Sequence, residues 1–347
     1  MPLITDYSQV CEVYRQAAEL GVALAAFCVE DRETLEAILA SALEYGREIG
    51  VENLPVIPSW TARYAQRPQA RLVAACGDPV LGTRLLLADL AVFMGENSPY
   101  QRLHVMPHLD HAIPWLDADI MELAPGRLAS VMYDASARPL DENIQLTAAF
   151  VERMHGKVLI EGAVDEILEA GAAGPTDKLT TVAQAERFLR ETGVDVLVPN
   201  VGTEHRSPVS RARYQSERAR AICAAVGKVL CLHGSSSLRL DDLARLPGDG
   251  FIKVNIFTTL AVHGGQAVAR NVLANLGDML GEEELRGLVA QGVLGERVLA
   301  AASRGKTPLG PKLASVANAC RRDVWYGAVK ERCMRYLRAL NYVAYAQ

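Results

Sequence analysis

The sequence predicts an α/β fold, a (β/α)8 or TIM barrel with an extra helical segment after the eighth strand. Its 347 residues suit one large barrel, and half of them are hydrophobic. Eight short apolar segments alternate with longer amphipathic ones, the order of βα units. No G-x-G-x-x-G motif follows the first apolar segment, which disfavours the alternative, a doubly wound open sheet. We therefore expect residues 1–347 to form a single barrel domain, with a helical insertion at about 263–316.

The eight predicted strands are almost continuously apolar. Parallel strands that are buried on both faces have this character, whereas strands with one solvated face alternate apolar and polar residues. The strands are predicted at residues 22–29, 53–59, 102–111, 129–136, 157–163, 194–201, 228–234 and 251–257.

Helices are predicted between these strands, most clearly at residues 31–50, 139–156 and 180–193. The third segment begins with threonine and ends with glycine, the residues that favour the first and last positions of a helix. The insertion at 263–316 has a helical pattern with a break rich in glycine and proline near 305–311. It fits a lid, an oligomer contact or a packing segment.

Composition excludes several classes of partner and location. The net charge is −5 and no dense run of lysine and arginine occurs, so we expect neither nucleic acid nor an anionic membrane surface as a partner. No run of eighteen apolar residues and no signal-peptide pattern is present. Seven cysteines are scattered without a C-x-x-C pair, which indicates free thiols in a reducing cytoplasm.

Polar residues gather at the ends of the predicted strands, which is where barrels of this kind carry their chemistry. Three of the four histidines found there come from different strands. Three neutral imidazoles with one open position make a catalytic zinc site. The residues at the strand ends are His108, Asp110, His111, Asp134, Ser136, Glu161, His205, His233, Asn255 and Thr258.

Asp110 has two interpretations. It is either a carboxylate that orients a metal-binding histidine or a general acid/base beside the metal. Neighbours on a regular strand face opposite ways. Asp110 and His111 therefore reach the same site only if the strand is already turning into its loop.

The loop "HGSSS" after the seventh strand is a candidate phosphate site, together with "NIFT" after the eighth. Barrels often bind phosphate in these two loops, and glycine and serine let backbone N–H groups approach its oxygens. The alternative is an ordinary glycine- and serine-containing loop.

These segments together resemble the class II, metal-dependent fructose-bisphosphate and tagatose-bisphosphate aldolases. "HLDH" resembles the family's H-x-D-H, and "SVMYDAS" its S-V-M-x-D-x-S. "PLDENIQLT", "VGTEH", "LHGSSS" and "KVNIFTT" follow in the family's order. The resemblance runs from "GVALAAFCVED" to "AVKERCMRYLRALN" near the C-terminus.

The resemblance implies roles for these residues. His111, His205 and His233 would bind Zn²⁺ or another divalent ion, and Asp110 would be the catalytic acid/base. His108 and Glu161 would bind the metal or support the site, with support the expected role of His108. The residues implied to hold the substrate and its phosphate are Gly202, Gly234, Ser235, Ser236, Asn255 and Thr258.

The substrate-binding residues depart from the family pattern. Phe257 and Thr259 stand where the family has the two aspartates of D-T-D, and Ala163 replaces an acidic residue. Cys28 stands where the first strand usually carries asparagine. Arg206 replaces a glycine and is either a new anion contact or a surface arginine. We therefore expect a substrate other than fructose 1,6-bisphosphate.

The leading hypothesis is a cytoplasmic zinc-dependent lyase of carbohydrate metabolism, a homodimer or homotetramer. It would make or break a C–C bond of a phosphorylated ketose, or a related small molecule, through a metal-stabilised enediolate. One alternative is an isomerase or epimerase that uses the same enediolate chemistry. The other is a non-catalytic partner subunit that has lost the aldolase activity.

Overall fold

The predicted barrel is present in the computed structural model, which describes residues 3–166, 179–204, 214–304, 309–316 and 318–346. Eight parallel strands form a closed ring, because the first pairs with both the second and the last. This closure rules out the open sheet. In order around the ring, the strands are β1 (Leu24–Cys28), β2 (Pro55–Thr61), β4 (His108–Ala112), β5 (Ser130–Tyr133), β6 (Leu159–Ala163), β7 (Val196–Val198), β8 (Leu230–Leu232) and β9 (Phe251–Ile256).

The prediction of one strand at 102–111 is wrong in detail. The segment forms a short strand, β3 (His104–Val105), which pairs only with β2, and then the barrel strand β4. Pro107 separates the two, and proline has no N–H to donate to a strand ladder. Its carbonyl instead accepts the backbone N–H of Ala129, at 2.8 Å.

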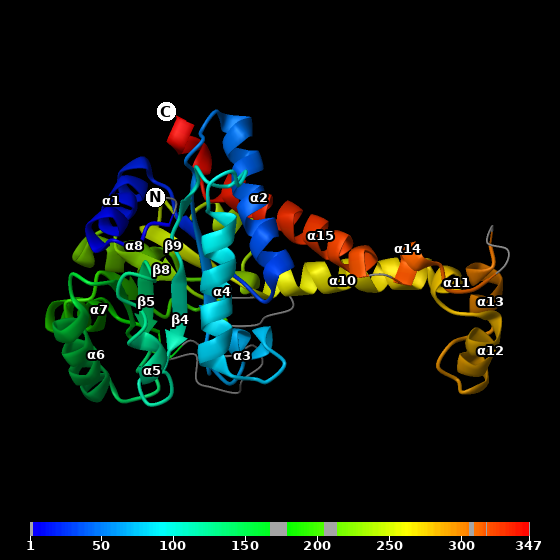
Figure 1. Ribbon diagram of the computed structural model, residues 1–347. Helices are drawn as coiled ribbons and strands as arrows, with labels where there is room; N and C mark the ends of the chain where they lie inside the picture. Colours follow the sequence, from blue (N-terminus) through cyan, green and yellow to red (C-terminus); the bar gives the residue numbers. More distant parts are fainter. Residues whose placement is uncertain (1–2, 167–178, 205–213, 305–308, 317, 347) are drawn as a thin grey trace.

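Helices surround the ring (Figure 1). The three predicted most clearly are present as α2 (Arg32–Ile49), α6 (Leu140–Met154) and α7 (Val182–Thr192). Thr181 caps α7 and Gly193 ends it in the left-handed conformation, as predicted. The other helices of the barrel are α1 (Tyr7–Leu20), α3 (Gln69–Val73), α4 (Pro79–Phe93), α5 (Ala118–Met121), α8 (Ser216–Val226), η1 (Ser235–Ser237), α9 (Leu240–Leu243) and η2 (Tyr342–Ala346).

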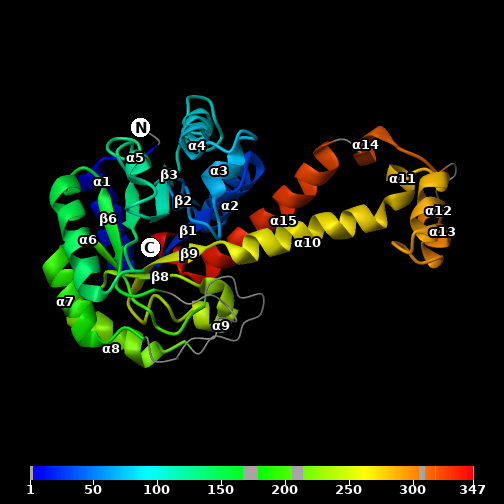
Figure 2. The same ribbon diagram turned by 90° about the horizontal axis from the view of Figure 1, so that it is seen from below.

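A helical arm extends away from the barrel (Figures 1 and 2). Its shaft is formed by α10 (Thr258–Ala274) and α15 (Asn318–Ala339), which pack along each other. Gly264 allows the close approach, because a Cβ atom there would lie 2.8 Å from the Trp325 ring. The Trp325 indole donates to Thr34 Oγ1 at 2.9 Å and so ties the arm to α2.

The outer end of the arm has a small hydrophobic cluster of its own, around Leu276, Leu285 and Ala302. The helices there are α11 (Leu276–Met279), α12 (Glu282–Ala290), α13 (Arg297–Ala302) and α14 (Leu313–Val316). The segment 263–316 is therefore helical in its described part, as predicted. Residues 305–308 of the predicted break lie outside the described residues.

The interior of the barrel is not wholly apolar. Every residue of β1, β2, β4, β5, β6 and β9 is buried, yet His108, Glu161 and Lys253 have no exposed surface at all. Buried charges are tolerated only when they are paired and hydrogen-bonded. Lys253 contacts both His108 and Glu161, so the three side chains form one polar layer inside the barrel.

The described cysteines Cys11, Cys28, Cys76, Cys223, Cys231 and Cys333 are free thiols. Within the described ranges, no helix has both the length and the apolar character that crossing a bilayer demands.

Candidate metal and substrate site

The end of β4 brings Asp110 and His111 to the same site. His111 has φ = 44°, the left-handed conformation that non-glycine residues rarely adopt. The pairing of β4 with β5 also shifts register between Leu109 and Ala112. The strand thus turns at His111, which is the condition the sequence required for two adjacent side chains to face the mouth. A local conformation of this kind costs about 1–3 kcal/mol, and such costs are concentrated at functional sites.

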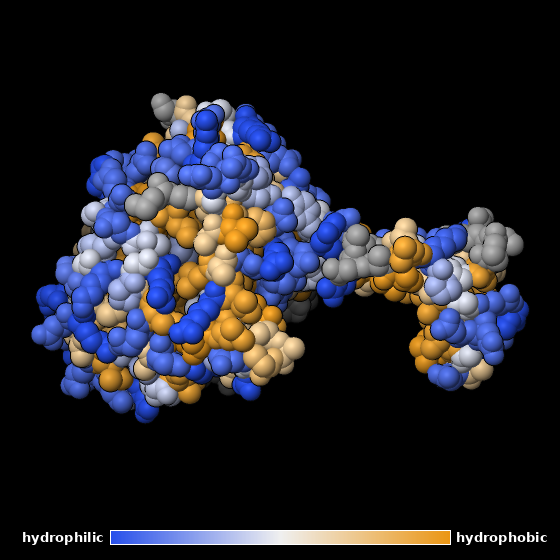
Figure 3. Space-filling model, in the orientation of Figure 1, coloured by the Kyte–Doolittle hydropathy of each residue, from blue (hydrophilic) through white to orange (hydrophobic). Residues whose placement is uncertain are grey.

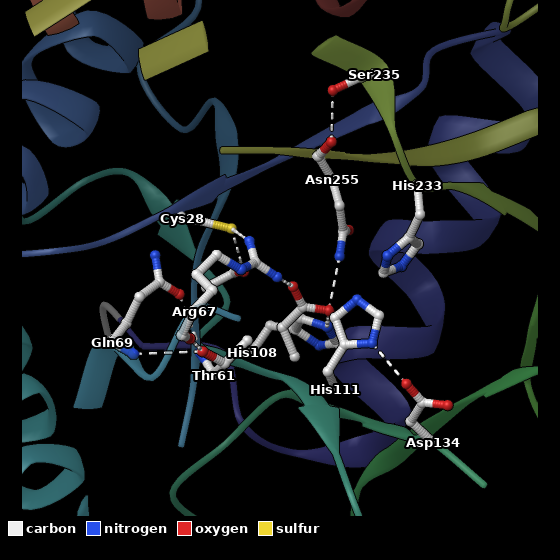
Figure 4. Close-up of polar contacts among 12 residues, drawn as sticks. Cys28, Thr61, Arg67, Gln69, His108, His111, Asp134, His233, Ser235 and Asn255 are labelled. Carbon is white, nitrogen blue, oxygen red and sulfur yellow. Dashed lines mark hydrogen bonds and ion pairs between the residues drawn. The ribbon is translucent and has the colours of Figure 1, made fainter. Parts of the chain in front are cut away.

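His111 and His233 meet at the mouth of the barrel (Figure 4). Their ring centroids lie 4.9 Å apart, with the ring planes at 83° to each other. Asp110, His111 and His233 each have a possible ligand atom, and these three atoms lie within 4.8 Å of one another. Two imidazoles and a carboxylate are a donor set that suits zinc.

A carboxylate orients each of these two histidines. Asp134 Oδ2 lies 2.6 Å from His111 Nδ1, and Glu161 Oε1 lies 3.1 Å from His233 Nε2. Contacts of this type fix the ring orientation and tautomer of metal-binding histidines. Asp134 is thus a carboxylate that is hydrogen-bonded to the His111 ring.

The pKa values of the two rings move in opposite directions. Burial opposes the protonation of His111, but the carboxylates of Asp110 and Asp134 outweigh it and raise the pKa of His111. For His233, burial dominates and lowers the pKa. The neutral ring of His233 is therefore the form favoured at neutral pH.

His108 lies one layer deeper in the barrel. Its Nδ1 is 2.8 Å from Ser130 Oγ, and its Nε2 is 3.0 Å from Lys253 Nζ. Burial and then the charge of Lys253 lower the pKa of His108 to about 3. Both ring nitrogens thus contact protein groups.

Lys253 joins this layer to Glu161. Its Nζ lies 2.6 Å from Glu161 Oε2, and neither side chain has exposed surface. Burial raises the pKa of Glu161, but the charge of Lys253, the hydrogen bond with His233 and the charge of His108 together lower it below its ordinary value. A second group of possible metal-binding residues, Glu161, Cys231 and His233, lies at the same level.

Asp110 is held by two donors in the interior. Asn255 Nδ2 donates to Asp110 Oδ1 at 2.9 Å, and Arg67 Nη2 donates to Oδ2 at 2.5 Å. Burial opposes ionisation of Asp110, but the neighbouring charges of His111 and Arg67 hold its pKa well below the usual range. The carboxylate is therefore ionised.

A cavity opens next to the histidines. Its walls combine the two histidines, the loops after β8 and β9, and two residues that follow β2. The residues that line it are Tyr64, Arg67, His111, His233, Gly234, Ser235, Ser236, Asn255, Phe257 and Thr258.

The loop after β8 is compact. Gly234 has φ = 72°, and a Cβ atom there would lie 2.8 Å from the carbonyl oxygen of Glu204, so only glycine fits. Ser235 Oγ donates to the carbonyl oxygen of Asn255 at 2.6 Å, and Ser237 Oγ to that of Gly234 at 2.7 Å. These two hydroxyls therefore shape the loop.

The remaining predicted residues are placed as follows. Gly202 is not among the described residues that line the cavity; it has φ = 87°, and its N–H lies 3.1 Å from Asn200 Oδ1. Thr258 is the first residue of α10 and lines the cavity. His205 and Arg206 lie outside the described residues.

Tyr64 and Arg67 were not predicted from the sequence. Tyr64 stacks on His111, with centroids 4.5 Å apart and ring planes at 10°. Both residues follow β2, which continues to Thr61, two residues beyond its predicted end. The rule that the C-terminal ends of barrel strands carry the site, applied to this strand too, would have indicated the segment after Thr61, but not the contact of Arg67 with Asp110.

Most of the chain matches a known protein family. The family model described as "Fructose-bisphosphate aldolase class-II" matches residues 8–293. Proteins named fructose-bisphosphate aldolase from two strains of Staphylococcus epidermidis are 26% identical to this chain over 283 residues, which covers 79% of this chain and 87% of each relative.

Two solved structures share the fold. The YdjI aldolase from Escherichia coli K12 is 20% identical, with a TM-score of 0.65, and 97% of this chain and 98% of that one are covered. Fructose-bisphosphate aldolase from Campylobacter jejuni is 17% identical, with a TM-score of 0.72 and coverage of 98% and 95%.

Proposed function

Because the chain belongs to the class II fructose-bisphosphate aldolase family, we propose that it is a zinc-dependent aldolase-type lyase with a substrate other than fructose 1,6-bisphosphate. The observation that carries the proposal is the convergence of Asp110, His111 and His233 at the mouth of the barrel. The Staphylococcus epidermidis relatives are named fructose-bisphosphate aldolase. We infer the type of reaction from the family, but we propose a different substrate.

The donor chemistry fits a divalent ion. His111 and His233 would hold it, with His205 as the third ligand that the sequence predicts. A divalent ion bound there would act as a Lewis acid on the carbonyl and the adjacent hydroxyl oxygen of the substrate. Asp134 and Glu161 would keep the two described imidazoles oriented.

Asp110 would move the proton. During cleavage, the carboxylate accepts the proton of the hydroxyl group on the carbon that becomes the aldehyde, while the electron pair of the broken C–C bond remains with the ketone half. During synthesis, Asp110 returns the proton. Asn255 and Arg67 hold the carboxylate in place.

Phe257 supports the exclusion of fructose 1,6-bisphosphate. It lines the cavity at a position where the family has an aspartate, and an aromatic ring cannot accept a hydrogen bond from a sugar hydroxyl as a carboxylate does. A hydroxyl left unpaired there costs about 1–3 kcal/mol. We expect fructose 1,6-bisphosphate cleavage to be weaker by at least one to two orders of magnitude than in an enzyme with the family's aspartate.

The test has two parts, both on the zinc-loaded protein. Deuterium exchange into dihydroxyacetone phosphate and dihydroxyacetone in D₂O, followed by NMR, reports the enediolate chemistry without any knowledge of the aldehyde. Exchange that chelation abolishes is expected. Fructose 1,6-bisphosphate cleavage with kcat/KM above about 10⁴ M⁻¹s⁻¹ would refute the altered substrate, and the absence of exchange with both ketones would refute the aldolase proposal.

We also propose a homodimer or homotetramer. Apolar side chains gather on the surface over α3 and α4 (Figure 3). Leu72 is 71% exposed and Val92 is 77% exposed, and exposed apolar patches of this kind commonly mark interfaces. Light scattering that gives the mass of one 37.6 kDa chain would exclude both oligomers.

A further inference from the structure

Arg67 occupies the space between Asp110 and the cavity. Its Nη2 donates to Asp110 Oδ2 at 2.5 Å, and its Nη1 to Cys28 Sγ at 2.7 Å. The guanidinium also lies 4.9 Å from the centroid of the Phe257 ring. Arg67 lines the cavity with a side chain that is 10% exposed, whereas the Asp110 side chain has no exposed surface. A substrate therefore meets Arg67 before it meets Asp110.

The backbone around Arg67 is held in a fixed shape. Thr61 Oγ1 donates to the carbonyl oxygen of Arg67, and Gln69 Oε1 accepts the Thr61 N–H at 3.1 Å. The Gln69 N–H in turn donates to Thr61 Oγ1 at 3.3 Å. Figure 4 shows these contacts beside the histidines. Because Arg67 and Gln69 are both hydrogen-bonded to Thr61 at the end of β2, the backbone that carries the guanidinium is fixed to the barrel.

Arg67 gives the cavity its charge. Of the described residues that line the cavity, it alone carries a permanent charge. The family pattern would place two polar residues here, an asparagine on β1 and an aspartate after β9. This chain has Cys28 and Phe257 at these positions, and Arg67 contacts both. Arg67 is therefore the group in the described lining with which an anionic group of a substrate can pair.

We propose that Arg67 is a specificity-determining residue that binds a carboxylate on the aldehyde half of the substrate; this inference rests on the proposed function. The hydroxyl that gives its proton to Asp110 is on the carbon that becomes the aldehyde. A group bound to Arg67, which contacts Asp110 directly, therefore belongs to the same half of the substrate.

When the substrate binds, Arg67 exchanges one carboxylate partner for another. Arg67 leaves Asp110 Oδ2 and binds the substrate carboxylate with its two η nitrogens, the planar arrangement that arginine offers to carboxylates. The nearly buried guanidinium keeps one negative partner throughout. Asp110 Oδ2 is then released to accept the hydroxyl proton. The step breaks one C–C bond, whose electron pair stays with the ketone half, and yields an aldehyde that carries a carboxylate.

A neutral aldehyde cannot make this exchange, because Arg67 would have to leave Asp110 without a replacement. Loss of one partner from a buried, hydrogen-bonded charge pair weakens binding by about 30-fold or more. We therefore expect the protein to prefer a carboxylate-bearing aldehyde over a neutral aldehyde of the same size by at least about 30-fold in kcat/KM.

The experiment measures condensation of the exchanging ketone donor with matched aldehydes on the zinc-loaded protein. Succinic semialdehyde is compared with butanal, glyoxylate with glycolaldehyde, and glyceraldehyde 3-phosphate with glyceraldehyde. Arg67→Met removes the charge but keeps a side chain that packs on Phe257, and Arg67→Lys keeps the charge without the planar fork. Arg63→Met is the matched control, because Arg63 lies in the same loop and pairs with Asp119 at 2.6 Å.

The wild-type protein and Arg63→Met should prefer the carboxylate acceptors, Arg67→Lys should keep part of the preference, and Arg67→Met should lose it. Equal rates with neutral acceptors in the wild type, or a preference that Arg67→Met retains, would overturn the proposal. A preference for the phosphate acceptor alone would overturn the carboxylate assignment. The wild-type ratios decide the matter even if a variant does not fold. Donor exchange without acceptor preference refutes only this inference, whereas no exchange refutes the aldolase function.

Discussion

Substitution of Asp134 by asparagine should weaken zinc binding without removing a ligand. Asp134 Oδ2 lies 2.6 Å from His111 Nδ1, and both side chains are nearly buried. Asparagine keeps the size and one acceptor oxygen but removes the charge that supports the imidazole. The loss of such an orienting carboxylate typically costs 10- to 100-fold in metal affinity, or about 1.4–2.7 kcal/mol.

The assay is competition for zinc between the protein and a chromophoric chelator at pH 7.5. Ser136→Ala is the matched control. Its hydroxyl donates to Asp134 Oδ1 at 2.6 Å, on the side of the carboxylate away from His111, so its removal should change the affinity by less than the loss of the charge. Equal zinc affinity in Asp134→Asn and the wild type would refute the role of His111 as a ligand oriented by Asp134.

Three further predictions concern the metal, pH and stability. His233→Ala should lose zinc, measured by elemental analysis of the dialysed protein, and wild-type zinc content would exclude His233 as a ligand. Burial, and then the charge of Asp31, raises the pKa of Glu30 to about 7. The folded state therefore holds this proton more tightly than the unfolded state, and stability should fall as pH rises from about 4.5 to 7, by up to about 3 kcal/mol. Urea unfolding of Glu30→Gln should show a smaller fall, and an unchanged pH dependence would contradict the raised pKa. Lys253→Met should destabilise the fold by about 3–5 kcal/mol, because it removes the cation that pairs with the buried Glu161 carboxylate; a loss under 1 kcal/mol would show that the pair is not needed.

The barrel was predictable because its signal is local. Buried parallel strands are apolar along their whole length, and the cap residues of a helix such as α7 lie within a few positions of its ends. The break between β3 and β4 was not predicted, because the apolar pattern continues across Pro107. The pairing of α10 with α15 joins segments far apart in the chain, which no local pattern reveals.

The candidate site was predictable to a similar degree. His111 and His233 stand at strand ends in a recognisable order, and the turn at His111 follows from the need to bring Asp110 to the same place. The position of Arg67 depends on contacts of its loop with the end of β2. Nothing in the sequence around Arg67 indicates that its side chain folds back onto Asp110.

The most direct test of the metal site is a crystal structure of the zinc-loaded protein, with anomalous data collected at the zinc absorption edge. We expect one zinc ion per chain at the mouth of the barrel, within about 2.0–2.1 Å of a nitrogen of each of His111, His205 and His233. Zinc held instead by Glu161, Cys231 and His233, the deeper group of possible ligands, would contradict the account, as would a structure with no zinc at either place.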